Sequence, residues 1–353
     1  QEGDKVHKKS SAHQVCIYCK PRLGQGTHQE CFGKRSCSCF LTIIQVQREP
    51  AVLRGVPVGP CTSLWDKEYL CMHGGNRDVK VHVSPHRHMD FVQKNFIYRT
   101  LPFCQLVERA SKSRNTNFFI NETEFYYFRT LGSDSRREPA NIVAQFPELA
   151  KDVTLPKWFP DESFFSSVLR IASPQLSLWT HYDVMDNFLI QVKGKKKAVL
   201  FHPNDFEYLY IQGKLHELRQ SCRSVQLQIF ILGDKSLVLD LECPDLAKFP
   251  KFQKATRYEA TLTSGDILFI PALWFHNITA LDFGIAVNVF WKNLDASLYD
   301  KKDPYGNKDL IPASSALTLV EKAVKQLQLL PLDCQQFYAL KMISHIKNHF
   351  GLS

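Results

Sequence analysis

The 353-residue chain contains no apolar run approaching the roughly 20 residues that cross a bilayer. Its first residues, QEGDKVHKKSSAH, also lack the apolar stretch of a secretory signal. We therefore expect a soluble, intracellular protein, cytoplasmic or nuclear, that makes no contact with a membrane.

The 11 cysteines lack the even number and regular spacing of a disulfide framework. Several crowd into the first 39 residues, and we expect the others to be reduced thiols, as in a reducing cell interior. These others are Cys61, Cys71, Cys104, Cys222, Cys243 and Cys334.

Acidic residues are outnumbered, with 35 Asp and Glu against 44 Lys and Arg, which gives a net charge of +9. A basic balance suits a polyanionic partner such as nucleic acid. The excess is modest, however, and an ordinary solvated surface explains it equally well.

Residues 1–44 are basic and Cys-rich and show no hydrophobic period, so we expect a poorly ordered segment. Cys16-x-x-Cys19, followed by His28 and Cys31, has the residue types of a zinc site. No strand or helix pattern frames these four residues. Both a zinc site and an unstructured tail therefore stay open.

Residues 45–312 are predicted to form the main domain, which begins with a lead-in over 45–165. The lead-in combines the strand patterns AVLRG, VKVHV, FFINE and FYYFRT with a helix around PFCQLVERASKS. His82, His86 and His88 lie here without an acidic residue at ligand spacing. We expect these histidines to lie in an exposed loop rather than in a metal site.

The core of the domain, residues 166–292, consists of short strand patterns separated by Gly, Pro and Asp turns. This pattern predicts a mainly β fold, closed or double-layered, such as a jelly roll. After Pro312 the period changes to 3.6, and two amphipathic helices are expected over 313–353, separated by Pro331. Part of their apolar faces should pack on the β domain, and the remainder is a natural homodimer contact.

The segment LWTHYDVMDN carries the strongest chemical signal, because side chains two apart on a strand point to the same side. His181 and Asp183 can therefore hold one metal ion together. A third ligand, His276, follows in GDILFIPALWFH. Two imidazoles and one carboxylate form the facial triad of non-haem Fe(II) oxygenases, which leaves three coordination positions for 2-oxoglutarate and O₂.

These motifs resemble those of the JmjC-type 2-oxoglutarate oxygenases, and most closely those of the tRNA hydroxylases of wybutosine synthesis. The resemblance extends over most of residues 50–350 and includes GPCTSLW, KNFIYRTLPF, CPDLAKFP, VNVFWK and YDKKDPYGNKD. It implies a double-stranded β-helix core of the cupin type with C-terminal helices, and a dioxygenase activity.

The resemblance further implies that His181, Asp183 and His276 hold iron and that Lys196 pairs with the distal carboxylate of 2-oxoglutarate. An ammonium at the bottom of a barrel is physically suited to that role. From the residues alone, the lysines of VKGKKK could equally form a solvated hairpin. Tyr127 and Asn187 match the other cosubstrate contacts.

The implied substrate is the wybutosine-precursor side chain at position 37 of tRNA(Phe). Exposed basic residues would contact tRNA phosphates, and the candidates are Lys112, Arg114, Arg136 and Arg137. The alternatives are a JmjC protein hydroxylase or demethylase, and a non-catalytic jelly-roll module. The last arises because residues 1–44 and an insert at about 215–233 depart from the family pattern, and a displaced strand would impair the site.

Overall fold

The computed structural model describes residues 46–156, 158–212, 215–216, 229–230 and 233–352, and near the N-terminus residues 13–14 and 16–19. The chain consists of two compact units. One is Gln1–Asn293 with Lys302–Asn307, and the other is Leu294–Lys301 with Lys308–Ser353. Among the described residues, no helix is long and apolar enough to cross a membrane.

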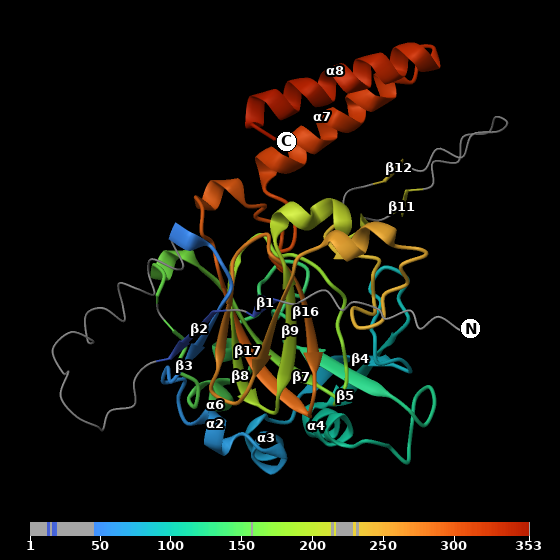
Figure 1. Ribbon diagram of the computed structural model, residues 1–353. Coiled ribbons are helices and arrows are strands. Elements are labelled where there is room, and N and C mark those ends of the chain that lie inside the picture. Colours follow the sequence, from blue (N-terminus) through green and yellow to red (C-terminus); the bar gives the residue numbers. More distant parts are fainter. Residues whose placement is uncertain are drawn as a thin grey trace, which may run out of the picture. The chain divides into compact units, whose positions relative to one another are not determined.

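The two main β-sheets of the first unit have nine and four strands, and their strands enclose one interior (Figure 1). The nine-stranded sheet has the order β2-β3-β15-β8-β17-β7-β6-β4-β5, and the four-stranded sheet has the order β1-β14-β9-β16. The strands of the large sheet are β2 (Cys16–Cys19), β3 (Ala51–Arg54), β4 (Asp78–Ser84), β5 (Ile97–Pro102), β6 (Phe125–Arg129), β7 (Phe164–Ala172), β8 (Asp186–Lys193), β15 (Ile267–Ile270) and β17 (Gly284–Trp291). Those of the small sheet are β1 (His13–Gln14), β9 (Lys196–Phe201), β14 (Arg257–Leu262) and β16 (Phe275–Ala280). The predicted jelly-roll core is confirmed.

The central strands β8, β15 and β17 are buried almost throughout, because both faces of the large sheet are covered. Alternate residues such as Phe188 and Phe269 face a core that includes Trp65, Leu70 and Leu106 from the helical lead-in. The other residues, among them Leu189 and Leu268, pack against the small sheet. The inner face of the large sheet is therefore where polar residues can line an interior site.

Short helices pack against the outer face of the large sheet, and the labels of α2, α3, α4 and α6 lie at one end of the strands in Figure 1. They are α2 (Cys61–Leu64), α3 (Lys67–His73), α4 (Phe103–Ser111), α5 (Ile142–Gln145) and α6 (Pro147–Ala150). The predicted helix around PFCQLVERASKS corresponds to α4, which buries Phe103, Leu106, Val107 and Ala110 on one stripe.

Two predicted strands are wrong. FFINE forms bends, because the Glu124 carboxylate accepts hydrogen bonds from the N–H groups of Phe119 and Ile120 and so replaces a strand ladder. The strand predicted to carry His181 and Asp183 is not formed, and residues 176–183 make only isolated bridges, at Ser177 and His181. Between them the Asn277 side chain donates to the Leu178 carbonyl in place of a backbone N–H.

The expectation of reduced thiols is wrong for Cys71 and Cys104, which form a disulfide between α3 and α4 with their Cα atoms 4.5 Å apart. The packing of these two helices brings together cysteines that are 33 residues apart, which spacing alone does not reveal. Cys61, Cys243 and Cys334 are free, and Cys222 lies outside the described residues.

Replacing Cys104 by serine is expected to lower the free energy of unfolding by roughly 3 kcal/mol, because the open chain gains conformational entropy when unfolded. Urea unfolding of the two proteins without reductant measures the difference, and dithiothreitol should remove it. Complete alkylation of Cys71 and Cys104 in the folded, non-reduced protein would contradict the disulfide.

The second unit contains α7 (Ile311–Leu327) and α8 (Leu332–Phe350), which contact each other. Pro331 caps the start of α8, as the sequence predicts. Neither helix has a buried residue. Large apolar side chains are exposed along both, including Leu319, Val324, Phe337, Leu340 and Ile343.

A candidate metal and cosubstrate site

The structure brings together the three predicted metal ligands, His181, Asp183 and His276. The backbones of the two histidines bond in both directions, with N···O distances of 2.8 and 3.2 Å, which sets their rings 4.4 Å apart. An Asp183 oxygen lies 3.6 Å from Nε2 of His276. Each residue offers one ligand atom, and these atoms all lie within 4.8 Å of one another.

His181 and Asp183 come together in an irregular segment, and regular strand alternation is not what aligns them. The two bridge bonds to β16 hold His181, and the Leu273 N–H donates to the Asp183 carbonyl at 2.8 Å. The tertiary contacts with the β15–β16 connection therefore position the pair.

Both imidazoles are oriented as metal ligands. Nδ1 of His181 lies 3.0 Å from the Trp179 carbonyl, and Nδ1 of His276 lies 3.0 Å from the Trp274 carbonyl. A proton on each Nδ1 satisfies these carbonyls and leaves the Nε2 lone pairs for an ion. Burial lowers the pKa of both histidines, so they are neutral at neutral pH, the form that binds metal. Two nitrogens and one oxygen suit Fe(II).

A cavity of about 40 Å³ lies beside the two histidines and is also lined by Tyr127, Asn187 and Lys196. Of the neighbouring lysines, Lys195 is exposed and Lys197 pairs with glutamates, whereas Lys196 is only 4% exposed. Within the part of the chain that the structure describes, no carboxylate forms an ion pair with Lys196. Burial, with a contribution from Arg170, lowers its pKa to about 7.

Other polar groups in this cavity also lack complete hydrogen bonding. Asn187 Oδ1 accepts from Asn288 Nδ2 at 2.9 Å, so the amide NH₂ is the end of Asn187 that can donate to a carboxylate. Asn288 Oδ1 and Arg170 Nε are buried without a hydrogen-bond partner among the described residues. The Tyr127 hydroxyl accepts from Arg170. A small anion with several oxygens fits this set of groups.

The sequence alone does not identify Arg170 and Asn288 as residues that line this cavity. The only signal for Asn288 is a polar residue inside the apolar run GIAVNVFW, which a buried strand does not otherwise contain. Arg170 ends the run SSVLR in β7 and is indistinguishable, in sequence, from a surface arginine.

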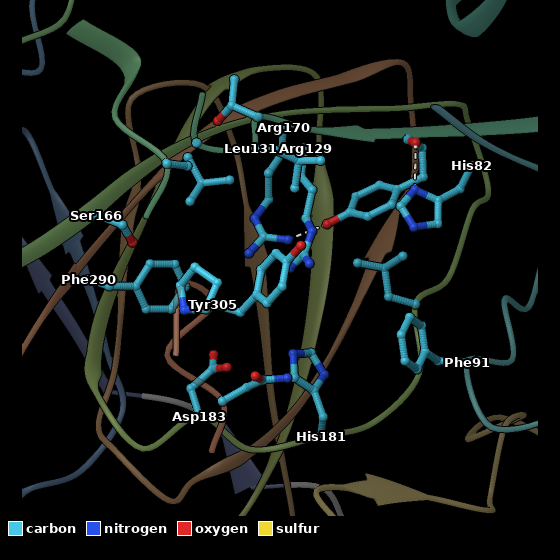
Figure 2. A pocket seen from close by; sticks show the side chains of 18 of the residues that line it. His82, Phe91, Arg129, Leu131, Ser166, Arg170, His181, Asp183, Phe290 and Tyr305 are labelled. Atoms are coloured by element: carbon cyan, nitrogen blue, oxygen red, sulfur yellow. Dashed lines mark hydrogen bonds between the residues drawn. The ribbon is translucent and has the colours of Figure 1, made fainter. Parts of the chain in front are cut away.

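A second, larger cavity of about 230 Å³ is lined by His181 and Asp183 (Figure 2). Aromatic rings and cations provide ten of its 24 lining residues. They include Phe91, Tyr98, Tyr127, Trp179, Phe290 and Tyr305, and Lys80, Arg129, Arg170 and Lys235. A planar, electron-rich guest is suited to such walls.

His82 also lines the larger cavity, so the prediction of an exposed loop is wrong for it. It lies buried in β4, with Nδ1 3.3 Å from the Tyr127 carbonyl, and burial lowers its pKa to about 4. His86 is exposed as predicted, and His88 is half-buried 3.6 Å from an Asp240 carboxylate oxygen. His82 lies within β4, whereas His86 and His88 lie beyond the end of this strand at Ser84.

The remaining sequence candidates do not meet at this site. The four basic candidates for tRNA contact, Lys112, Arg114, Arg136 and Arg137, are exposed and do not line either cavity. In the suggested zinc site, His28 and Cys31 lie outside the described residues, and the same holds for the side chains of Cys16 and Cys19.

The insert does not displace a strand of the small sheet. β9 pairs with β14 from Phe201↔Arg257 to Lys196↔Leu262, and with β16 over the same residues. The described part of the insert forms its own ladder, β11 (Leu215–His216) with β12 (Ile229–Phe230). Next to it, β10 (Ile211–Gln212) pairs with β13 (Lys235–Ser236). The sheet that carries His276 is therefore complete.

A jelly roll that groups two histidines and an aspartate at the junction of two interior cavities defines a cupin-like metal-binding protein. The family model described as a cupin-like domain matches residues 38–297. The chain is 52% identical to tRNA wybutosine-synthesizing protein 5 of Danio rerio, over 88% of this chain and 89% of that protein. It is 50% identical to the Homo sapiens protein of the same name, over 88% of this chain and 92% of that protein.

A more distant match, 33% identical, is tRNA wybutosine-synthesizing protein 4 of Aspergillus oryzae, of which the alignment covers 27%. The chain belongs to the cupin-like proteins and, within them, to the family of tRNA wybutosine-synthesizing protein 5. The resemblance inferred from the sequence motifs is thereby confirmed.

Proposed function

We propose that the chain is an Fe(II)- and 2-oxoglutarate-dependent hydroxylase that acts on the wybutosine-precursor side chain at position 37 of tRNA(Phe). The proposal is carried by the His181, Asp183 and His276 cluster at the junction of the two cavities, together with the family. One cavity holds the buried Lys196, which forms no ion pair with any described carboxylate, and the other has several aromatic residues in its walls.

His181, Asp183 and His276 would hold the iron. Bound Fe(II) supplies the coupling of O₂ reduction to oxidative decarboxylation of 2-oxoglutarate, with succinate, CO₂ and the hydroxylated side chain as products. Lys196 pairs with the distal carboxylate, while Tyr127 and Asn187 orient the cosubstrate through hydrogen bonds. These contacts fix the direction of the cosubstrate between its two ends.

The larger cavity receives the modified base at position 37 of the tRNA. A nucleotide beside the anticodon lies in a single-stranded loop and enters a pocket with little loss of stacking. Exposed lysines and arginines would contact the phosphates and make binding dependent on salt. A partner of this kind agrees with the positive net charge of the chain.

The test compares three substrates in the presence of iron and 2-oxoglutarate. They are tRNA(Phe) that carries the wyosine-type precursor, unmodified tRNA(Phe), and histone or ankyrin-type peptides. Hydroxylation of the precursor alone, seen as a mass increase of one oxygen in the isolated nucleoside, supports the proposal. Hydroxylation of a peptide in place of tRNA would make the chain a protein hydroxylase, and no turnover with any substrate would make it a binding module.

The affinity for 2-oxoglutarate is expected to fall as the pH rises above 7. Burial holds the pKa of Lys196 at about 7, and a bound carboxylate raises it again, so binding takes up a proton above this pH. Titration of the Mn(II) form should show about 25-fold weaker binding at pH 8.5 than at pH 6.5. Lys196→Arg should remove this dependence, and an unchanged slope in this variant would contradict the assignment.

The lowered pKa of Lys196 also makes the stability of the folded protein depend on pH. Without ligand, the folded protein releases the Lys196 proton near pH 7, and the unfolded chain releases it near 10.5. Between these values the unfolded state binds more protons, so the contribution of Lys196 to stability increases as the pH rises.

We also infer that the chain forms a homodimer through α7 and α8. Phe337, Leu340 and Ile343 recur at helical spacing on α8 and are at least half exposed. Such an apolar stripe is stabilised when a second copy covers it. Sedimentation should give a dimer at micromolar concentration, Leu340→Glu should shift it to monomer, and Lys341→Glu should not. A native monomer would count against the inference.

A further inference from the structure

Three cations form a row across neighbouring strands of the large sheet. Arg129 of β6 lies directly opposite Arg170 of β7 in the strand register. In β4, Val81 pairs with Phe128, so Lys80 follows at the level of Arg129. All three line the larger cavity, and Figure 2 shows Arg129 and Arg170 facing the space above Asp183 and His181.

Within the described part of the chain no carboxylate touches this row, and the nearby Asp183 acts on Arg129 and Arg170 only through its charge. Among the described residues, no carboxylate forms an ion pair with Lys80, Arg129 or Arg170. The acidic groups that line the same cavity are engaged elsewhere. Asp183 lies against His276, Asp234 pairs with Lys235, and Glu138 accepts from the Asp134 N–H.

Such an arrangement is unfavourable without a ligand. Like charges directly opposite each other on a sheet destabilise it, and withdrawal from water adds to the penalty. Burial lowers the pKa of Arg129, and the neighbouring Arg170 adds to this effect. An anion bound in the cavity would offset both contributions.

The three cations have different partners. Arg170 donates to Tyr127, which lines both cavities, and so belongs to the cosubstrate end. The Arg129 guanidinium lies 4.6 Å from the ring centre of Tyr305, and Lys80 Nζ lies 4.2 Å from that of Tyr98. The aromatic faces hold these two cations at the substrate end.

We propose that Arg129 and Lys80 form a second anion site, separate from Lys196, which binds a carboxylate on the side chain of the substrate base. They thereby select the free acid over its ester. The assignment rests on the proposed function, because it assigns the larger cavity to the base. Aromatic walls for a planar ring and two cations for a carboxylate match a modified base with an acidic side chain.

A tRNA phosphate has the same charge, and the experiment separates the two sources. The substrates are tRNA(Phe) with a carboxylate on the position-37 side chain, and the same tRNA after methyl esterification, which leaves the phosphates unchanged. The native enzyme should show kcat/KM roughly 10- to 100-fold higher for the acid. In Arg129→Gln this ratio should fall to within about threefold of one, and Arg129→Lys should restore part of it.

The acid-to-ester ratio distinguishes recognition from a general loss of activity, because a purely structural defect lowers both rates together. Lys80→Gln provides a second variant if Arg129→Gln does not fold, as judged by its melting curve. Lys151→Gln removes one positive charge from an exposed position in an ion pair with Glu148 and should keep the native ratio.

Equal rates of the native enzyme on acid and ester would overturn the carboxylate site and leave the proposed function intact. A parallel loss on both substrates in an Arg129→Gln protein that keeps the native melting curve would assign the cations to a phosphate and also overturn it. Failure of the native enzyme to hydroxylate either tRNA would overturn the proposed function, and the carboxylate site with it.

Discussion

Asp183→Ala is expected to lower iron-dependent decarboxylation of 2-oxoglutarate by more than about 100-fold. The carboxylate is the one anionic member of the cluster, since burial keeps both histidines neutral. Its loss leaves two neutral ligands, which bind Fe(II) weakly. Release of labelled CO₂ measures turnover, and Mn(II) titration measures the metal affinity independently.

Asp183→Asn keeps the volume of the side chain and removes its charge, so it should show most of the same loss. Asp282→Ala changes an exposed aspartate and should behave like the native protein. Removal of metal by a chelator should stop turnover in both the native protein and Asp282→Ala, and added Fe(II) should restore it. Metal binding by Asp183→Ala with native affinity would show that the ligand set is wrong.

Lys196→Ala is expected to raise the KM for 2-oxoglutarate by roughly 100-fold. The side chain is buried in the smaller cavity, and under the proposed function its removal would leave the distal carboxylate without a counter-charge in a low-dielectric space. The Mn(II) affinity should remain close to native, because Lys196 is not among the grouped metal ligands.

Lys195→Ala is the matched control. The adjacent lysine carries the same charge one position earlier and is exposed, so its loss should leave KM unchanged within about twofold. Equal effects of the two substitutions would mean that general electrostatic attraction, and not a specific ion pair, binds the cosubstrate.

Arg170 links the two cavities, since it lines both and donates to Tyr127. Cosubstrate and substrate would therefore share one hydrogen-bonded partner. A cosubstrate that orders Tyr127 also orders Arg170, which then adjoins Arg129 in the cation row.

Local patterns in the sequence predict many of the strands and helices of this protein and part of its candidate metal site. The apolar runs of β8, β15 and β17 predict buried strands. The apolar residues of α7 and α8 recur every 3.6 residues, which predicts two amphipathic helices. The spacing of His181 and Asp183, with His276 far along the chain, is also visible locally. Two of the three side chains lie within one short segment.

Only the tertiary structure decided which lysine of VKGKKK turns inward, because exposure depends on what packs over the hairpin. It also joined Cys71 to Cys104 across 33 residues and set Arg129 opposite Arg170. These pairings join elements that are distant in sequence, and no local hydrophobic pattern reveals them. Strand register and helix packing, which sum many weak long-range contacts, decide where such residues meet.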